Sequence, residues 1–146
     1  MLTARKFAND SPWAIVAAVA ILFVGHSGPV LSDEIKVMLS GGQEIPPVTT
    51  PAMGTGIISV AADKSVRGSV TITGMTVTVA HIHEAPTGKS GPIVIPLVQT
   101  ADNVWSVPEG VKLTDAQFES YKAGNLYYNV HSAAYKSGEV RGQIRP

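Results

Sequence analysis

The chain has 146 residues, with 11 basic and 11 acidic side chains and no cysteine. A balanced charge of this kind does not favour nucleic-acid binding, because that affinity comes largely from cationic contacts with phosphates. The absence of cysteine excludes disulfides, thiol nucleophiles and thiolate metal sites. Any metal chemistry would have to use histidine, carboxylate, tyrosine, methionine or backbone oxygen.

Residues 1–32 have the pattern of a secretory signal peptide. Arg5 and Lys6 give a basic start, and an apolar run over residues 14–25 follows. This run is shorter than the roughly 20 apolar residues of a membrane-spanning helix. Val30 and Ser32 suit the −3 and −1 positions of a cleavage site, so we expect cleavage after Ser32 and export to the periplasm or the extracellular space. Retention of the segment as an N-terminal anchor is the alternative.

Residues 33–146 are enough for one domain with its own core. Alternating apolar and polar residues, enriched in β-branched types, predict strands in the first two thirds of this domain. These strands are expected at residues 34–41, 55–62, 66–74, 76–84, 93–99 and 103–108. The second and third are close enough to form a hairpin. Pro96 cannot donate to a ladder, so the strand that contains it should lie at an edge or carry a bulge.

One helix is predicted over about 114–123. Thr114 can act as the N-cap, Gln117 stands three residues later as its capping-box partner, and Gly124 is the favoured residue after the helix end. Two further strands, 126–132 and 139–145, should close the chain as a hairpin. Seven or eight short strands and one helix indicate an antiparallel, Greek-key-like β-sandwich.

Three segments resemble the CHRD domain, a family named after the animal protein chordin. They are SGGQEIPPVTTPAMGTG, AHIHEAPTGKSGPIVIPL and GNLYYNVHSAAYKSGEVRGQIR, in this order along residues 33–146. The resemblance implies an exported β-sandwich. In the animal protein such domains accompany modules that bind bone morphogenetic proteins, but a lone domain need not share that partner. The family resemblance therefore indicates fold and compartment more directly than function.

Three histidines form the candidate metal site. His81 and His83 are two apart on a predicted strand, so their side chains share one face, as in the His-X-His copper ligands of the copper–zinc superoxide dismutases. His131 lies on the predicted closing hairpin. If that hairpin lies beside the strand of His81, three neutral imidazoles could hold Cu²⁺ or Zn²⁺ and leave a fourth position open.

A polar surface is expected around these histidines. If the apolar sides of the closing hairpin face the core, its polar sides coincide and form a set of six residues: Tyr127, Asn129, His131, Glu139, Arg141 and Gln143. Glu84, Asn129 or Glu139 could accept the N–H of a ligating histidine, on the ring nitrogen that does not bind the metal, and so fix its tautomer. The supporting network predicted from the sequence is therefore Glu84, Asn129, Glu139, Arg141 and Gln143.

The same histidines have a purely structural interpretation. Val77 and Val79 share the strand face of His81 and His83, so this face could be partly core. The histidines would then be neutral and hydrogen-bonded, and would help to specify one packing arrangement.

Three functions follow from these alternatives. The first is an exported, non-enzymatic CHRD module, a monomer or weak dimer that binds a protein or envelope partner. The second is a copper- or zinc-binding protein that uses His81, His83 and His131. The third is a superoxide-dismutase-like enzyme. The sequence favours the first and gives least support to the third, because ligands for a second metal and a stabilising disulfide are missing.

Overall fold

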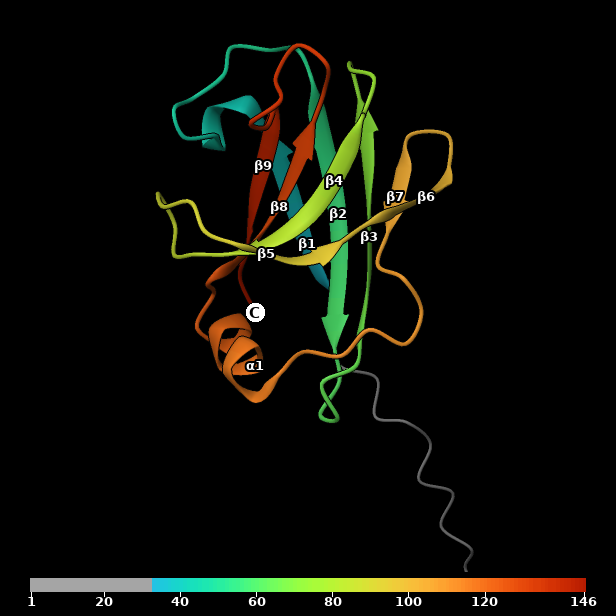
Figure 1. Cartoon of the computed structure of the whole chain (residues 1–146), viewed down its shortest axis with the longest axis vertical. Helices are drawn as coiled ribbons and strands as arrows, with labels where there is room; N and C mark the ends of the chain where they lie inside the picture. Colours follow the sequence, from blue (N-terminus) through green and yellow to red (C-terminus); the bar gives the residue numbers. More distant parts are fainter. Residues whose placement is uncertain (1–32) are drawn as a thin grey trace, which may run out of the picture.

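The computed structural model describes residues 33–146, and the predicted signal peptide lies outside these residues. The described chain forms nine strands, a short 3-10 helix and one α-helix (Figure 1). Their bounds are β1 Ile35–Ser40, η1 Gly41–Gln43, β2 Met53–Val60, β3 Val66–Thr73, β4 Val79–Glu84, β5 Ile93–Pro96, β6 Val98–Ala101, β7 Val104–Ser106, α1 Asp115–Lys122, β8 Leu126–His131 and β9 Val140–Ile144.

The strands form one antiparallel sheet in the order β5-β4-β8-β9-β1-β2-β3-β7-β6. Its two ends, β5 and β6, are consecutive in the chain and separated by Leu97 alone. Because one continuous segment supplies both ends, the sheet curls into a nearly closed, sandwich-like barrel. The predicted all-β sandwich with one short helix is thereby confirmed, as are the β2–β3 and β8–β9 hairpins.

Two strand predictions need correction. The strand expected over 93–99 is divided into β5 and β6 at Leu97, whose N–H bonds the carbonyl of Ala80 at 2.9 Å. Pro96 ends β5 at an edge of the sheet, as its missing donor requires. The strand expected from Thr76 begins only at Val79, because the chain first leaves β3 through a turn at Gly74, where φ is +78°.

The core fills the space between the two halves of the curled sheet. Tyr128 on β8 is fully buried and reaches across this space, where its hydroxyl donates to the carbonyl of Ile57 on β2 at 2.8 Å. Two glycines make room for it: a Cβ at Gly68 would lie 2.7 Å from the Tyr128 hydroxyl, and one at Gly56 would lie 3.0 Å from its ring. The apolar side of β8 therefore faces inward, which turns its polar side outward.

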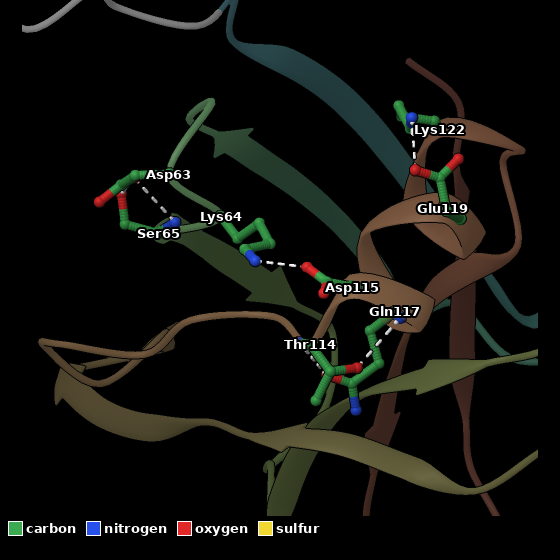
Figure 2. A network of polar contacts seen from close by, with 8 residues as sticks. All are labelled: Asp63, Lys64, Ser65, Thr114, Asp115, Gln117, Glu119 and Lys122. Atoms are coloured by element: carbon green, nitrogen blue, oxygen red, sulfur yellow. Dashed lines mark hydrogen bonds and ion pairs between the residues drawn. The ribbon is translucent and has the colours of Figure 1, made fainter.

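Helix α1 lies at one end of the sheet and begins as the sequence predicts (Figure 1). Thr114 accepts from the backbone N–H of Gln117, and the Gln117 side chain accepts from the backbone N–H of Thr114, which completes the capping box (Figure 2). Lys64, in the β2–β3 turn, pairs with Asp115 and ties the helix start to the sheet. The helix ends at Lys122, and Gly124 adopts a left-handed φ of +74°.

Two long loops lie at the opposite end of the sheet from α1 (Figure 1). One joins η1 to β2 and the other joins β8 to β9. A third loop, residues 85–92, joins β4 to β5. In residues 33–146 no helix is both long and apolar enough to serve as a membrane span.

Candidate metal centre

Strands β4, β8 and β9 place the polar side chains of the sequence prediction on one outward face. In the register of β4 with β8, His81 lies opposite Asn129, His83 opposite Tyr127 and Val79 opposite His131. Cross-strand partners point to the same side of a sheet, so His131 lies diagonally beside His81. Strand β9 continues this face, with Arg141 opposite Asn129 and Gln143 opposite Tyr127.

The three histidines converge. One ligand atom from each of His81, His83 and His131 lies within 4.8 Å of the others. Nδ1 of His81 is 3.3 Å from Nε2 of His131. The ring centroid of His81 lies 5.5 Å from that of His83 and 5.2 Å from that of His131, and the two pairs of rings meet edge to face. The hairpin and the β4 strand thus bring together all three candidate ligands.

Backbone carbonyls fix the tautomers of two of the rings. Nδ1 of His83 lies 3.0 Å from the carbonyl oxygen of Gly91, and Nδ1 of His131 lies 2.9 Å from that of Lys136. Since a carbonyl oxygen can only accept, each Nδ1 carries the hydrogen and each neutral ring keeps its lone pair on Nε2. Nε2 of His83 is buried and has no hydrogen-bond partner among the described residues.

His81 is held differently from the other two histidines. With the lone pair of His131 on Nε2, the His81 Nδ1–H donates to it across the 3.3 Å contact. A metal ion at the centre of the cluster would replace this proton, and His81 would then bind through Nδ1. The available donor set is therefore Nδ1 of His81 with Nε2 of His83 and Nε2 of His131.

Burial keeps all three imidazoles in the neutral form. Desolvation is the main cause that lowers the pKa of His81, His83 and His131 below the usual value of 6.5. Repulsion between the rings adds to the lowering for His81 and His83, whereas the carbonyls of Gly91 and Lys136 partly oppose it for the rings they contact. At neutral pH the rings are unprotonated, which is the form that binds a metal.

A stack of three side chains supports His83. The Tyr127 ring lies parallel to the His83 ring, with an interplanar angle of 11° and centroids 5.0 Å apart. The guanidinium carbon of Arg141 lies over the Tyr127 ring, 3.5 Å from its centroid. Such cation–π and stacking contacts hold a ring in one orientation.

The same stack also holds the loop that supplies the Gly91 carbonyl. The Tyr127 hydroxyl accepts from the N–H of Gly91 at 3.2 Å, and Arg141 donates to the carbonyl of Lys89 at 2.7 Å. A Cβ at position 91 would lie 1.9 Å from the carbonyl oxygen of Glu84, so only glycine fits where the loop passes the end of β4. Loop 85–92, Tyr127 and Arg141 therefore form one unit that orients His83.

The other predicted network residues lie near the cluster but bond elsewhere. Glu84 accepts from the hydroxyl of Ser120 on α1, and Glu139 accepts from Thr50 at 2.6 Å. Gln143 donates to the carbonyls of Ala85 and Gly124 at 3.0 and 2.8 Å. The carboxylate or amide acceptors expected for the histidine N–H groups are thus replaced by the carbonyls of two loops.

Glu44 is a member of this polar face that the sequence did not reveal. It lies after η1, is 8% exposed, and accepts from the side-chain amide of Asn129 at 2.5 Å. Burial raises the pKa of Glu44 to about 7, although Arg141 and the Asn129 hydrogen bond oppose the rise. No periodic pattern marks this position, because it stands in a glycine- and proline-rich loop.

Comparison with known proteins gives one match. A family model of the CHRD domain matches residues 35–144, which is nearly the whole described part of the chain. Searches of curated proteins and of solved structures found no match to this chain. The family match agrees with the β-rich fold and with the three motifs of the sequence, and the chain belongs to the CHRD domain family.

Proposed function

We propose that this CHRD domain is an exported, non-enzymatic module that binds one Cu²⁺ or Zn²⁺ ion through His81, His83 and His131. The observation that carries the proposal is the convergence of three ring nitrogens within 4.8 Å from two separate strands. The signal-peptide pattern of residues 1–32 supports export, and the three-histidine cluster supports metal binding. This proposal gives the histidines a role beyond the purely structural interpretation.

The unpartnered nitrogen of His83 favours a ligand over a structural role. A buried polar atom without a partner costs about 1–3 kcal/mol, so a histidine retained for packing alone is expected to satisfy both ring nitrogens. His83 satisfies Nδ1, whereas its buried Nε2 has no hydrogen-bond partner in residues 33–146. A metal ion at the cluster would use this lone pair.

The donor set favours Cu²⁺ and Zn²⁺. Imidazole nitrogen is a preferred donor for both ions, whereas Ca²⁺ and Mg²⁺ prefer oxygen. The Gly91 and Lys136 carbonyls accept from the Nδ1–H of His83 and of His131, an outer contact that metal-binding histidines commonly have. Three protein ligands leave a fourth position open on a tetrahedral ion.

Calorimetric titration of the purified chain, made without a histidine tag, tests the proposal. We expect about one Cu²⁺ or Zn²⁺ per chain and a higher melting temperature with metal, because a ligand of the native state raises stability. His83→Ala should weaken binding by at least about a hundredfold, more than the typical effect of losing an outer partner.

Melting in the presence of a chelator separates the structural alternative. If the histidines serve packing alone, His83→Ala lowers the melting temperature in chelator. Added metal then changes the melting temperature of neither the parent chain nor the variant. This result would refute the metal proposal. Consumption of superoxide by the metal-loaded chain would instead favour the enzymatic alternative.

A further inference from the structure

The proposed metal site contains no negative charge of its own. All three donor residues are neutral imidazoles, and the cluster of candidate ligands in residues 33–146 includes no aspartate or glutamate. The three carboxylates of the surrounding network, Glu44, Glu84 and Glu139, accept from Asn129, Ser120 and Thr50 respectively. The three protein ligands would therefore leave the 2+ charge of the bound ion without an anionic ligand.

Three cationic side chains belong to the segments around the cluster. Arg141 is 3% exposed, and its guanidinium lies over the Tyr127 ring, which also stacks on His83. Loop 85–92, whose Gly91 carbonyl holds His83, contains one lysine and no acidic residue. The β8–β9 loop, residues 132–139, contains one lysine and Glu139, whose carboxylate accepts from Thr50. These lysines, Lys89 and Lys136, are exposed.

Solvent can reach the cluster. His131 is buried, but His81 and His83 are only half-buried. In the described part of the chain the His81 side chain has no carbonyl partner, and its hydrogen bond to the cluster is made through Nδ1. The side of the cluster formed by His81 is consequently the side from which a small solute can approach the metal.

We propose that the metal ion held by His81, His83 and His131 takes a small anion from solution as its fourth ligand. This inference rests on the metal proposal and adds the class of ligand: a halide, a pseudohalide, a carboxylate or a small oxyanion. The anion neutralises part of the charge of a dication whose three protein ligands are neutral, in a half-buried site where charges interact more strongly than in water. Lys89 and Lys136, on the two loops that hold His83 and His131, raise the local concentration of anions.

Azide titration of the Cu²⁺-loaded full chain tests this proposal. Visible absorption follows the azide-to-copper charge-transfer band, and electron paramagnetic resonance follows the copper ion. We expect saturable binding of one azide per copper. The double variant Lys89→Glu/Lys136→Glu should raise the apparent Kd for azide about fivefold at low ionic strength, and the difference should shrink at about 0.5 M salt because screening weakens exposed charges.

Lys36→Glu is the matched control. Lys36 is also exposed, but it lies on β1, three strands away from β4 in the sheet. At about 0.1 M salt its reversal should leave the azide affinity unchanged within about twofold, because exposed charges beyond a Debye length of about 10 Å are largely screened at that ionic strength.

The outcomes separate the two proposals. If copper binds through the histidines but azide up to about 100 mM changes neither spectrum, the anion proposal is overturned and the metal proposal stands. Equal azide affinities in the double variant and in Lys36→Glu would overturn the role given to the two lysines. If the chain binds no copper, the metal proposal fails, and the anion proposal fails with it.

Discussion

At the scale of single residues, the orientation of each histidine decides what the cluster can bind. The carbonyls of Gly91 and Lys136 place a hydrogen on Nδ1 of His83 and His131, so both rings direct an Nε2 lone pair for coordination. Within residues 33–146 the His81 side chain has no such carbonyl partner, and its hydrogen bond is to the His131 ring. We therefore expect His83 and His131 to contribute more to metal affinity than His81.

Two neighbouring tyrosines on β8 allow the support of His83 to be measured. Tyr127→Phe keeps the ring that stacks on His83 but removes the hydroxyl that accepts from Gly91. We expect this variant to bind Cu²⁺ or Zn²⁺ about tenfold more weakly, the scale seen when an outer partner of a metal ligand is lost. Calorimetry measures this change directly.

Tyr128→Phe is the control, because it removes a hydroxyl from the opposite face of the same strand. It leaves the carbonyl of Ile57 without its partner in the core and should lower the free energy of unfolding by about 1–2 kcal/mol. Its metal affinity should stay within about twofold of the parent chain. If both variants lose the same affinity, the effect of Tyr127→Phe is a general loss of stability and not a loss of orientation.

At the scale of elements, loops cover the polar face that the strands create. The segment between η1 and β2 supplies Glu44, which accepts a hydrogen bond from Asn129, and Thr50, which donates one to Glu139. Loop 85–92 is bonded to Tyr127 and Arg141. Tyr127, Asn129 and Arg141 are each 4% exposed or less, although they belong to the outward side of the sheet. The loops therefore act as a second, polar layer over β4, β8 and β9.

The Glu44 carboxyl in this layer predicts a pH dependence of stability. Its pKa is about 7 in the folded chain, against 4.5 as the ordinary value. Between these two pH values the folded state binds more protons than the unfolded state, so the contribution of Glu44 to stability falls as the pH rises. This contribution is complete below pH 4.5 and is lost once the pH has passed 7.

Denaturant unfolding in chelator, with the parent chain beside Glu44→Gln, measures the contribution. The glutamine stays neutral at every pH and keeps a carbonyl oxygen for Asn129. The free energy of unfolding of the parent, relative to the variant, should fall by about 3 kcal/mol between pH 4 and pH 8. A difference that does not change with pH would show that Glu44 is not desolvated in the folded chain.

At the scale of the whole molecule, the two sides of β8 serve different purposes. Tyr128 and its apolar neighbours fill the space inside the curled sheet, while Tyr127, Asn129 and His131 face the loops. Because side chains alternate along a strand, the core that stabilises the fold also fixes the positions of the outer polar residues. A one-residue shift of β4 against β8 would place the histidines in the core and separate the cluster.

Strand alternation explains how much of this arrangement the sequence predicts. The period of two in β4, β8 and β9 places His81 with His83, and His131 with Arg141, on common faces, and the caps of α1 mark the helix to within about one residue. Loop positions have no such period. The roles of Gly91, Lys136 and Glu44 depend on contacts between distant segments, so the acceptors of the histidine N–H groups could not be predicted correctly.

X-ray absorption spectroscopy of the Zn²⁺-loaded chain tests the central claim most directly. The account predicts one zinc per chain with three imidazole nitrogens at about 2.0–2.1 Å and one further light ligand. In His83→Ala the number of imidazoles per zinc should fall, or the zinc should be lost. A first shell of oxygen atoms with one imidazole or none would contradict the account, because His81, His83 and His131 would then not share a metal ion.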